Sequence, residues 1–179
     1  NSVTVLESSA FYGCSNLTSI NIPDGVTHID QSTFSGCTSL SNITLPSSVK
    51  SIGYFAFMNC TSLKSIKIPD NVTSIGWWAF SNCKSLTSVT IPERLNDIGA
   101  WAFSGCSSLT EFKVSAKNSN YISVNGVLYN KDKTVIIQYP AGKKDKSYKI
   151  PDGVTSISGD AFKYSANLTS ITIPGSVKY

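Results

Sequence analysis

The residues with the clearest chemical potential are five cysteines that recur at one spacing. Each lies 23 residues from the next: Cys14, Cys37, Cys60, Cys83 and Cys106. Thiols can form disulfides, bind metals or act as nucleophiles. Metal ligands must converge on one point and bridged thiols must face each other, whereas a column repeated once per unit points every sulfur in the same direction. We therefore predict reduced, buried cysteines that pack as small apolar residues.

Other side chains suited to catalysis are scarce. The chain has one histidine, His28, which excludes a mechanism that needs two. Asp24, Asp70 and Asp152 each follow a proline, where an acidic residue suits a turn. The sequence shows no phosphate-binding glycine loop, metal-ligand cluster or nucleophile elbow. We predict no enzyme activity, no cofactor and no metal site.

The 23-residue step also governs the apolar residues and so indicates the fold. Leucine, proline, valine and isoleucine columns keep the same phase as a phenylalanine column: Phe11, Phe34, Phe57, Phe80 and Phe103. The unit reads approximately L-x-x-I-x-I-P-x-x-V-x-x-I-G-x-x-A-F-x-x-C. A fixed period of this length is typical of a repeat solenoid, in which each unit buries its apolar face only against its neighbours.

Each unit contains two kinds of apolar spacing. In stretches such as LTSINIP, alternate residues are apolar, which predicts a strand that ends at the proline. In stretches such as IGYFAFMNC the spacing is nearer a helical turn. We expect a horseshoe with a parallel β-sheet on the concave face and short helical or 3₁₀ segments on the opposite side.

The period breaks once, in an irregular long repeat at residues 115–147. Two β-rich runs, Val127–Tyr129 and Thr134–Tyr139, flank the polar turn at residues 130–133 and predict an inserted β-hairpin. We assign residues 1–179 to a single solenoid. Because the repeat is already running at Asn1 and still running at Tyr179, we expect the chain to be a fragment of a longer protein.

The repeat unit with its Pro, Val, Ile-Gly, Ala-Phe and Cys positions resembles the BspA-like class of leucine-rich repeats. The segment NSNYISVNGVLYNKDKTVIIQYP resembles an insertion that recurs in that class. The resemblance implies a leucine-rich-repeat fold and a secreted or cell-surface location in bacteria or mucosal protists. It also implies adhesion to host extracellular or microbial surface proteins, or to glycans. The family has no shared catalytic residues to carry over.

One candidate binding surface is an aromatic cluster in three successive units, made by Tyr54, Phe55, Trp77, Trp78 and Trp101. Equivalent positions in the outer units are polar or small, so the repeat itself does not require aromatic residues. Aromatic faces suit sugar rings and protein contacts. The alternative is a cluster that covers the edge of the core or meets a neighbouring domain.

A second candidate surface consists of the outward residues of the predicted concave sheet. It includes Ser65, Lys67, Ser88, Thr90, Glu111, Lys113 and Lys149. This strip is polar and poor in the aromatic residues that anchor tight interfaces, so we expect weak contacts at most. The alternative is a solvated sheet face.

Positive charge concentrates in the irregular repeat. The chain carries a net charge of +4, and the segment from Lys113 to Lys149 holds eight Lys and two Asp, a local balance of +6. Such a segment could make salt-sensitive contacts with acidic glycans or simply aid solubility. Lysines without interleaved aromatic residues do not suit nucleic acid. No apolar run in residues 1–179 is long enough to insert into a membrane.

Together these features predict a recognition or adhesion module that acts without catalysis. The alternative function is a structural spacer that displays other domains.

Overall fold

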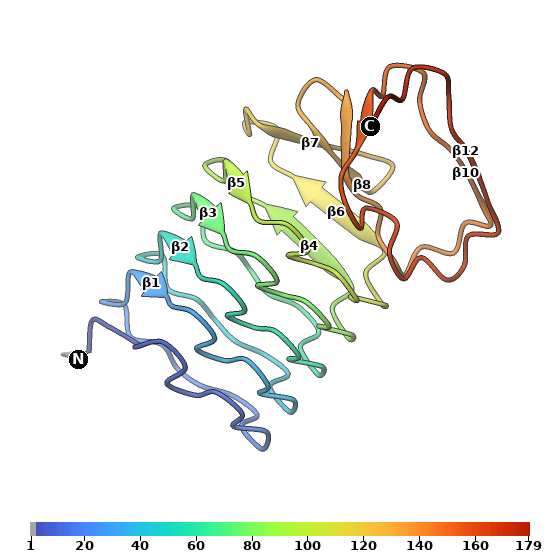
Figure 1. Ribbon diagram of the computed structural model, residues 1–179. Coiled ribbons are helices and arrows are strands. Elements are labelled where there is room, and N and C mark those ends of the chain that lie inside the picture. Colours follow the sequence, from blue (N-terminus) through green and yellow to red (C-terminus); the bar gives the residue numbers. More distant parts are fainter. Residues whose placement is uncertain (1–2) are drawn as a thin grey trace.

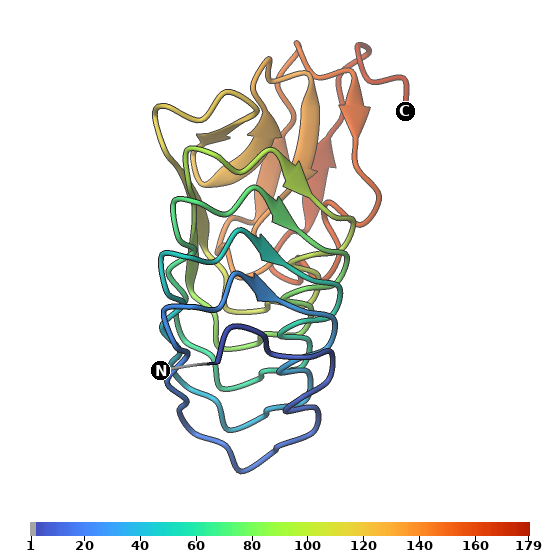
Figure 2. The ribbon, with the colours of Figure 1, turned by 90° about the vertical axis from the view of Figure 1, so that its left-hand side faces the viewer.

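The chain winds into stacked coils, one for each 23-residue repeat, that rise from the N-terminal end to the C-terminal end (Figures 1 and 2). The computed structural model describes residues 3–179. None of these residues forms a helix that could span a membrane. Because each coil repeats the path of the one before it, a given column of the repeat lies along one line of the stack.

The strand that the sequence predicts before each proline is present and pairs in parallel with its neighbours. β4 (Ser88–Ile91) pairs with β6 (Glu111–Val114). In the preceding coils, single bridges from Asn21 to Thr44 and from Thr44 to Lys67 continue the same column. In the last coils β10 (Ser147–Lys149) pairs with β12 (Ser170–Thr172). The predicted parallel arrangement is therefore confirmed.

A second parallel ladder follows the first within each coil. Its members are β1 (His28–Ile29), β2 (Ser51–Ile52), β3 (Ser74–Ile75) and β5 (Asp97–Ile98). These strands have two residues each, too short for a visible alternation of apolar and polar side chains. This ladder could therefore not be predicted from the sequence.

The short helical segments that we expected after this ladder are absent from the described residues, which form chains of turns instead. In the coil from Gly53 to Cys60, the amides of Met58 and Cys60 donate to carbonyl oxygens three residues earlier. The amides of Phe55 and Asn59 donate to carbonyl oxygens of the next coil. Both latter residues are left-handed, with φ of 57° and 61°. Alternate amides that bond between coils and left-handed residues are both incompatible with a helix.

Phenylalanine rings form the predicted interior ladder. Phe11, Phe34, Phe57, Phe80 and Phe103 stack in order with ring centroids 5.2–5.4 Å apart. Beside them, four cysteines are buried, and each thiol donates to a phenylalanine carbonyl oxygen in the preceding coil at 3.1–3.2 Å. Cys14 is exposed, because none of the coils that the structure describes packs over it.

The irregular repeat contains a three-stranded antiparallel meander in place of the expected hairpin alone. β8 (Val127–Asn130) and β9 (Val135–Gln138) are the predicted pair, which is confirmed. β7 (Tyr121–Val124) was missed and precedes them, joined to β8 by Asn125-Gly126. Both turn residues have positive φ, as a tight two-residue hairpin turn requires. β9 also pairs in parallel with β11 (Ser156–Ile157), so the meander occupies a place in the stack.

The buried residues form two clusters that meet at this meander. The first runs from Ile22 through the phenylalanine ladder to Leu128, and the second runs from Val127 to Ala161. In the second cluster Phe162 stacks on Tyr139, with ring centroids 5.4 Å apart. Tyr139 therefore occupies, in the coil next to that of Phe162, the position that a phenylalanine holds in the regular repeat.

Candidate recognition surfaces

The five aromatic residues of the predicted cluster come together on the turns that follow β2, β3 and β5. Phe55 stacks on Trp78 and Trp78 stacks on Trp101, with centroid distances of 5.2 and 4.5 Å. Trp77 packs edge-on against Trp78 and Trp101, and Tyr54 packs edge-on against Trp77. About half of the surface of Tyr54 and Trp77 is exposed, 53% and 50%. We call these five residues the aromatic cluster.

The stacked members of the aromatic cluster occupy an unusual backbone conformation. Phe55, Trp78 and Trp101 are left-handed, with φ of 55–60°, a region that Gly, Asn and Asp favour. The same column has Ser32 in an earlier coil and Asp160 in a later one, both also left-handed. Stacking of two aromatic rings contributes only about 0.5–1.5 kcal/mol beyond burial. The fold therefore requires the turn conformation but not the aromatic side chains.

Two hollows lie at the aromatic cluster. One, of about 260 Å³, is lined by Tyr54, Phe55, Trp77 and Trp78. The other, of about 410 Å³, lies beside Tyr54 and Trp77. It is lined in part by Ser51, Ser74 and Asp97 of the second ladder and by Asp30, which follows β1. Apolar ring faces next to a few polar groups are typical of a site that binds by stacking and orients its ligand by hydrogen bonds.

Six of the seven residues predicted on the concave strip lie side by side on neighbouring coils. Ser88 is in register with Glu111, and Thr90 with Lys113. Ser65 and Lys67 line a shallow depression of about 450 Å³ together with Ser88 and Thr90. Lys149 does not join them, because β10 pairs with β12 and not with β6. We call the six grouped residues the strand face.

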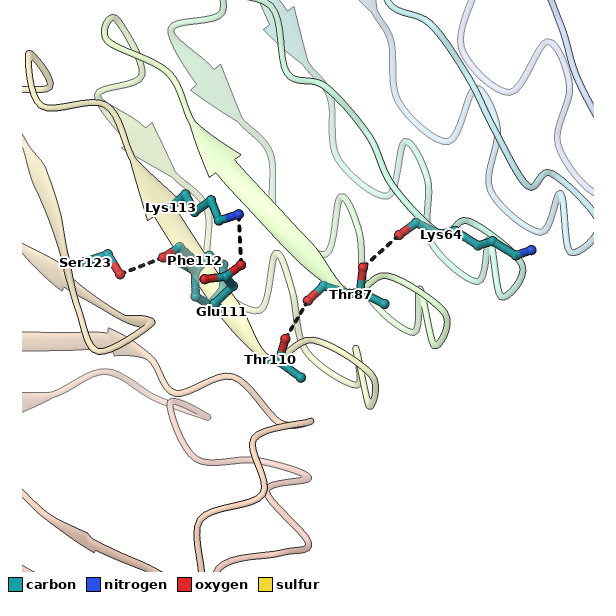
Figure 3. A network of polar contacts seen from close by, with 7 residues as sticks. All are labelled: Lys64, Thr87, Thr110, Glu111, Phe112, Lys113 and Ser123. Atoms are coloured by element: carbon teal, nitrogen blue, oxygen red, sulfur yellow. Dashed lines mark hydrogen bonds and ion pairs between the residues drawn. The ribbon is translucent and has the colours of Figure 1, made fainter.

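Polar groups of the strand face are engaged within the protein. The ammonium of Lys113 lies 3.0 Å from a carboxylate oxygen of Glu111, and both side chains are substantially exposed (Figure 3). Just before the strands, the Thr110 hydroxyl donates to the Thr87 carbonyl oxygen, and the Thr87 hydroxyl donates to that of Lys64 (Figure 3). These bonds tie coil to coil, and an exposed ion pair of this kind contributes little to stability or affinity.

The lysines of the irregular repeat are partly engaged as well. Lys143 pairs with Asp145 at 3.1 Å, and the ammonium of Lys131 donates to the Asn118 carbonyl oxygen at 2.6 Å. The Tyr139 hydroxyl donates to the same Asp145 carboxylate at 3.1 Å. Two lysines of this segment are therefore held by contacts within the protein.

The buried thiols are poor nucleophiles. Loss of solvation raises the pKa of Cys37 to about 11 and the pKa values of Cys60 and Cys106 to about 12. Burial also raises the pKa of Cys83 well above its usual value. A thiol at these pKa values is protonated at neutral pH, and the thiolate is the reactive form. Among residues 3–179, His, Cys, Asp and Glu side chains do not gather in threes as a metal site requires.

Stacked parallel coils built on a Leu-, Ile- and Phe-rich repeat define a leucine-rich-repeat protein. The repeat family described as the BspA type leucine rich repeat region matches residues 3–133 and 141–179 in six copies. The chain therefore belongs to the BspA-type leucine-rich-repeat family, as the resemblance in the sequence indicated. No curated protein matches the chain significantly.

Several solved structures of leucine-rich-repeat proteins are similar to the chain. One from Eubacterium ventriosum is 29% identical with a TM-score of 0.76, covering 91% of this chain and 49% of the other. A leucine rich cell surface protein from Faecalibacterium prausnitzii is 26% identical with a TM-score of 0.76, covering 95% and 58%. One from Bacteroides ovatus is 33% identical with a TM-score of 0.69, covering 97% and 42%. The chain thus spans about half the length of these relatives.

Proposed function

We propose that this chain is a non-catalytic recognition module of a secreted or cell-surface protein. It binds host extracellular or microbial surface proteins or glycans through the aromatic cluster. The observation that carries the proposal is that five aromatic residues gather on one surface although the repeat does not require them there. Half-exposed Tyr54 and Trp77 offer apolar rings to a partner, and contiguous exposed rings are a common feature of binding surfaces.

The comparisons support the location and the absence of catalysis. One similar structure is that of a leucine rich cell surface protein, and the family repeat covers most of the chain. The buried thiols are protonated, which leaves them without nucleophilic function at neutral pH. The proposal therefore needs only surface contact and no bond-making chemistry.

The aromatic cluster is the stronger of the two candidate surfaces. The strand face consists of Ser, Thr, Lys and Glu side chains, and its Glu111–Lys113 ion pair is exposed. Exposed charges bind weakly and lose affinity in salt, whereas stacking on aromatic rings is nearly independent of ionic strength. Salt dependence therefore distinguishes binding through the aromatic cluster from binding through the strand face or the Lys-rich segment.

The test is retention of the labelled chain on a panel of glycans, matrix proteins and fixed cells, at low and high salt. The variant Tyr54→Gln with Trp77→Gln replaces two half-exposed rings by the residue that an earlier coil carries in the same column, Gln31. We expect at least about a tenfold loss of retention with little change in melting temperature. The control is Tyr164→Ser, which removes an exposed ring outside the cluster.

Three outcomes would contradict the proposal. Equal retention of the double variant and the unaltered chain would show that the cluster does not bind. No retention of the folded chain on any surface would favour the spacer function. Retention that disappears in salt would move the site to the strand face or the Lys-rich segment.

A further inference from the structure

Neighbouring coils are joined by the same three main-chain hydrogen bonds at four successive interfaces. At the fourth, the amides of Trp78, Phe80 and Asn82 donate to the carbonyl oxygens of Ala100, Ala102 and Ser104 at 2.8–3.2 Å. The earlier interfaces repeat this pattern, each time with amides at alternate residues of one coil and carbonyls at alternate residues of the next. The turn side of each of these coils thus presents main-chain amides at alternate residues as donors to the chain of turns that packs on it.

The pattern stops at the next coil. Within residues 3–179, the amides of Trp101, Phe103 and Gly105, which hold the equivalent positions, donate to no backbone or side-chain acceptor. Tyr139 holds the phenylalanine position of the next coil, and its amide donates to the Ala161 carbonyl oxygen in the usual pattern. The equivalent acceptor for Phe103 is the carbonyl oxygen of Gln138 in β9, and it accepts no hydrogen bond from the Phe103 amide. β9 therefore fills the place of the next coil without accepting from the amides of the fifth coil.

A cleft of about 360 Å³ lies where the missing bonds would be. Residues 98–103 of the fifth coil line one side, and Ile137, Gln138, Ser158 and Gly159 line the other. Trp78 covers one face of the Trp101 indole, and Trp101 itself borders the cleft. The residues lining the cleft carry no ionisable side chain.

We propose that this cleft binds an uncharged peptide segment of a partner protein that adopts the same chain of turns as a coil. Two of its carbonyl oxygens, two residues apart, accept from the amides of Trp101 and Phe103. An apolar side chain of the peptide packs on Trp101. The inference rests on the proposed function and narrows its ligand from proteins or glycans to a peptide main chain.

The four preceding interfaces argue for a peptide over a sugar. In each of them the equivalent amides bond to main-chain carbonyl oxygens of alternate residues, which a chain of turns with left-handed residues presents. A glycan has no main-chain carbonyl oxygens at this spacing. Main-chain addition to an unpaired edge is a recurrent mode of peptide recognition, in which the backbone bonds give affinity and adjoining pockets select side chains.

The probe is a capped heptapeptide with the sequence of residues 53–59, Gly-Tyr-Phe-Ala-Phe-Met-Asn. Its carbonyl oxygens at Tyr54, Ala56 and Met58 accept such amides within this chain, and it contains no tryptophan. All three tryptophans of the chain lie in the aromatic cluster, so selective tryptophan excitation reports binding there. We expect a saturable change in emission.

A matched pair of glycine variants locates the site. A Cβ at Gly159 or at Gly153 would meet no heavy atom within 4 Å, and neither residue is left-handed, so both accept a larger side chain. Gly159 lines the cleft and Gly153 does not. We expect Gly159→Phe to weaken peptide binding at least about tenfold, because the ring fills the cleft, and Gly153→Phe to bind like the unaltered chain.

Absence of saturable peptide binding, or equal binding by Gly159→Phe and Gly153→Phe, would overturn the inference. The proposed function fails separately, when Tyr54→Gln with Trp77→Gln keeps full retention on the panel. Loss of retention in that double variant without any peptide binding would leave the recognition role standing and exclude this cleft as its peptide site.

Discussion

At the scale of single residues, the cysteine column shows how a chemically reactive residue is used for packing. Four thiols donate to carbonyl oxygens of the preceding coil and are surrounded by the phenylalanine ladder. Their raised pKa values follow from lost solvation. The constant spacing predicts that the cysteines are buried. It does not show that Cys14 is exposed, because burial of each thiol also depends on a neighbouring coil that packs over it.

We expect an alkylating reagent at pH 8 to modify Cys14 rapidly and the other four thiols only in denaturant. Mass spectrometry of the native and the unfolded chain gives the count. Because the buried thiols have pKa values above the usual 9.0, their burial in the protonated form stabilises the folded chain fully below pH 9. This stabilisation is lost as the pH rises towards about 12. Fast labelling of several thiols in the native chain would contradict the buried column.

Asn118 is a buried residue whose importance the sequence did not reveal. The side-chain nitrogen of Asn118 donates to the carbonyl oxygens of Pro92 and Leu95 at 2.7 and 2.9 Å. Its side-chain oxygen accepts from the amides of Asn120 and Tyr121, both at 2.8 Å. The residue thereby fixes the entry to the meander against the preceding coil.

We expect Asn118→Ala to lower the free energy of unfolding by about 2–4 kcal/mol, because it leaves several buried polar groups without partners. Urea unfolding followed by circular dichroism measures the change. Asn120→Ala is the control, since the Asn120 side chain is exposed and bonds only to the Ser119 hydroxyl. Equal losses in both variants would show that the buried bonds of Asn118 are not what stabilises the entry.

At the scale of elements, the repeat period predicted the features that depend on side-chain direction. The parallel strands before each proline and the phenylalanine ladder both follow from alternation and the constant 23-residue step. The turns were wrongly expected to be helical, because apolar spacing does not show that alternate amides bond to the next coil. β7 was not predicted although Asn125-Gly126 is a strong hairpin signal, since the polar turn at residues 130–133 already accounts for a hairpin between the two β-rich runs.

The phenylalanine ladder allows a test of stacking as the source of stability. Phe80 is fully buried between Phe57 and Phe103, so Phe80→Ala should cost about 3–5 kcal/mol. Phe11→Ala should cost clearly less, because Phe11 ends the ladder and is only partly buried. Thermal unfolding of both variants gives the comparison. A shift of no more than a degree or two for Phe80→Ala would show that the ladder is not core.

At the scale of the whole molecule, the position of the aromatic cluster could be predicted and the cleft beside it could not. The cluster follows from column positions in three successive repeats. The cleft depends on Gly159, which is far from Trp101 in sequence, and on β9, whose carbonyl oxygens do not accept from the amides of Trp101 and Phe103. One sequence signal was available, since Trp101 is the last aromatic residue of its column before the irregular repeat.

The most direct test of this interrupted stack is amide hydrogen exchange followed residue by residue by NMR. The amides of Trp78 and Phe80 bond to the next coil, so we expect them to exchange only when the chain unfolds globally. The amides of Trp101 and Phe103 should exchange at least about a hundredfold faster, because no described residue accepts from them. Equal protection of the two pairs would contradict the broken ladder, and with it the open cleft at the edge of the aromatic cluster.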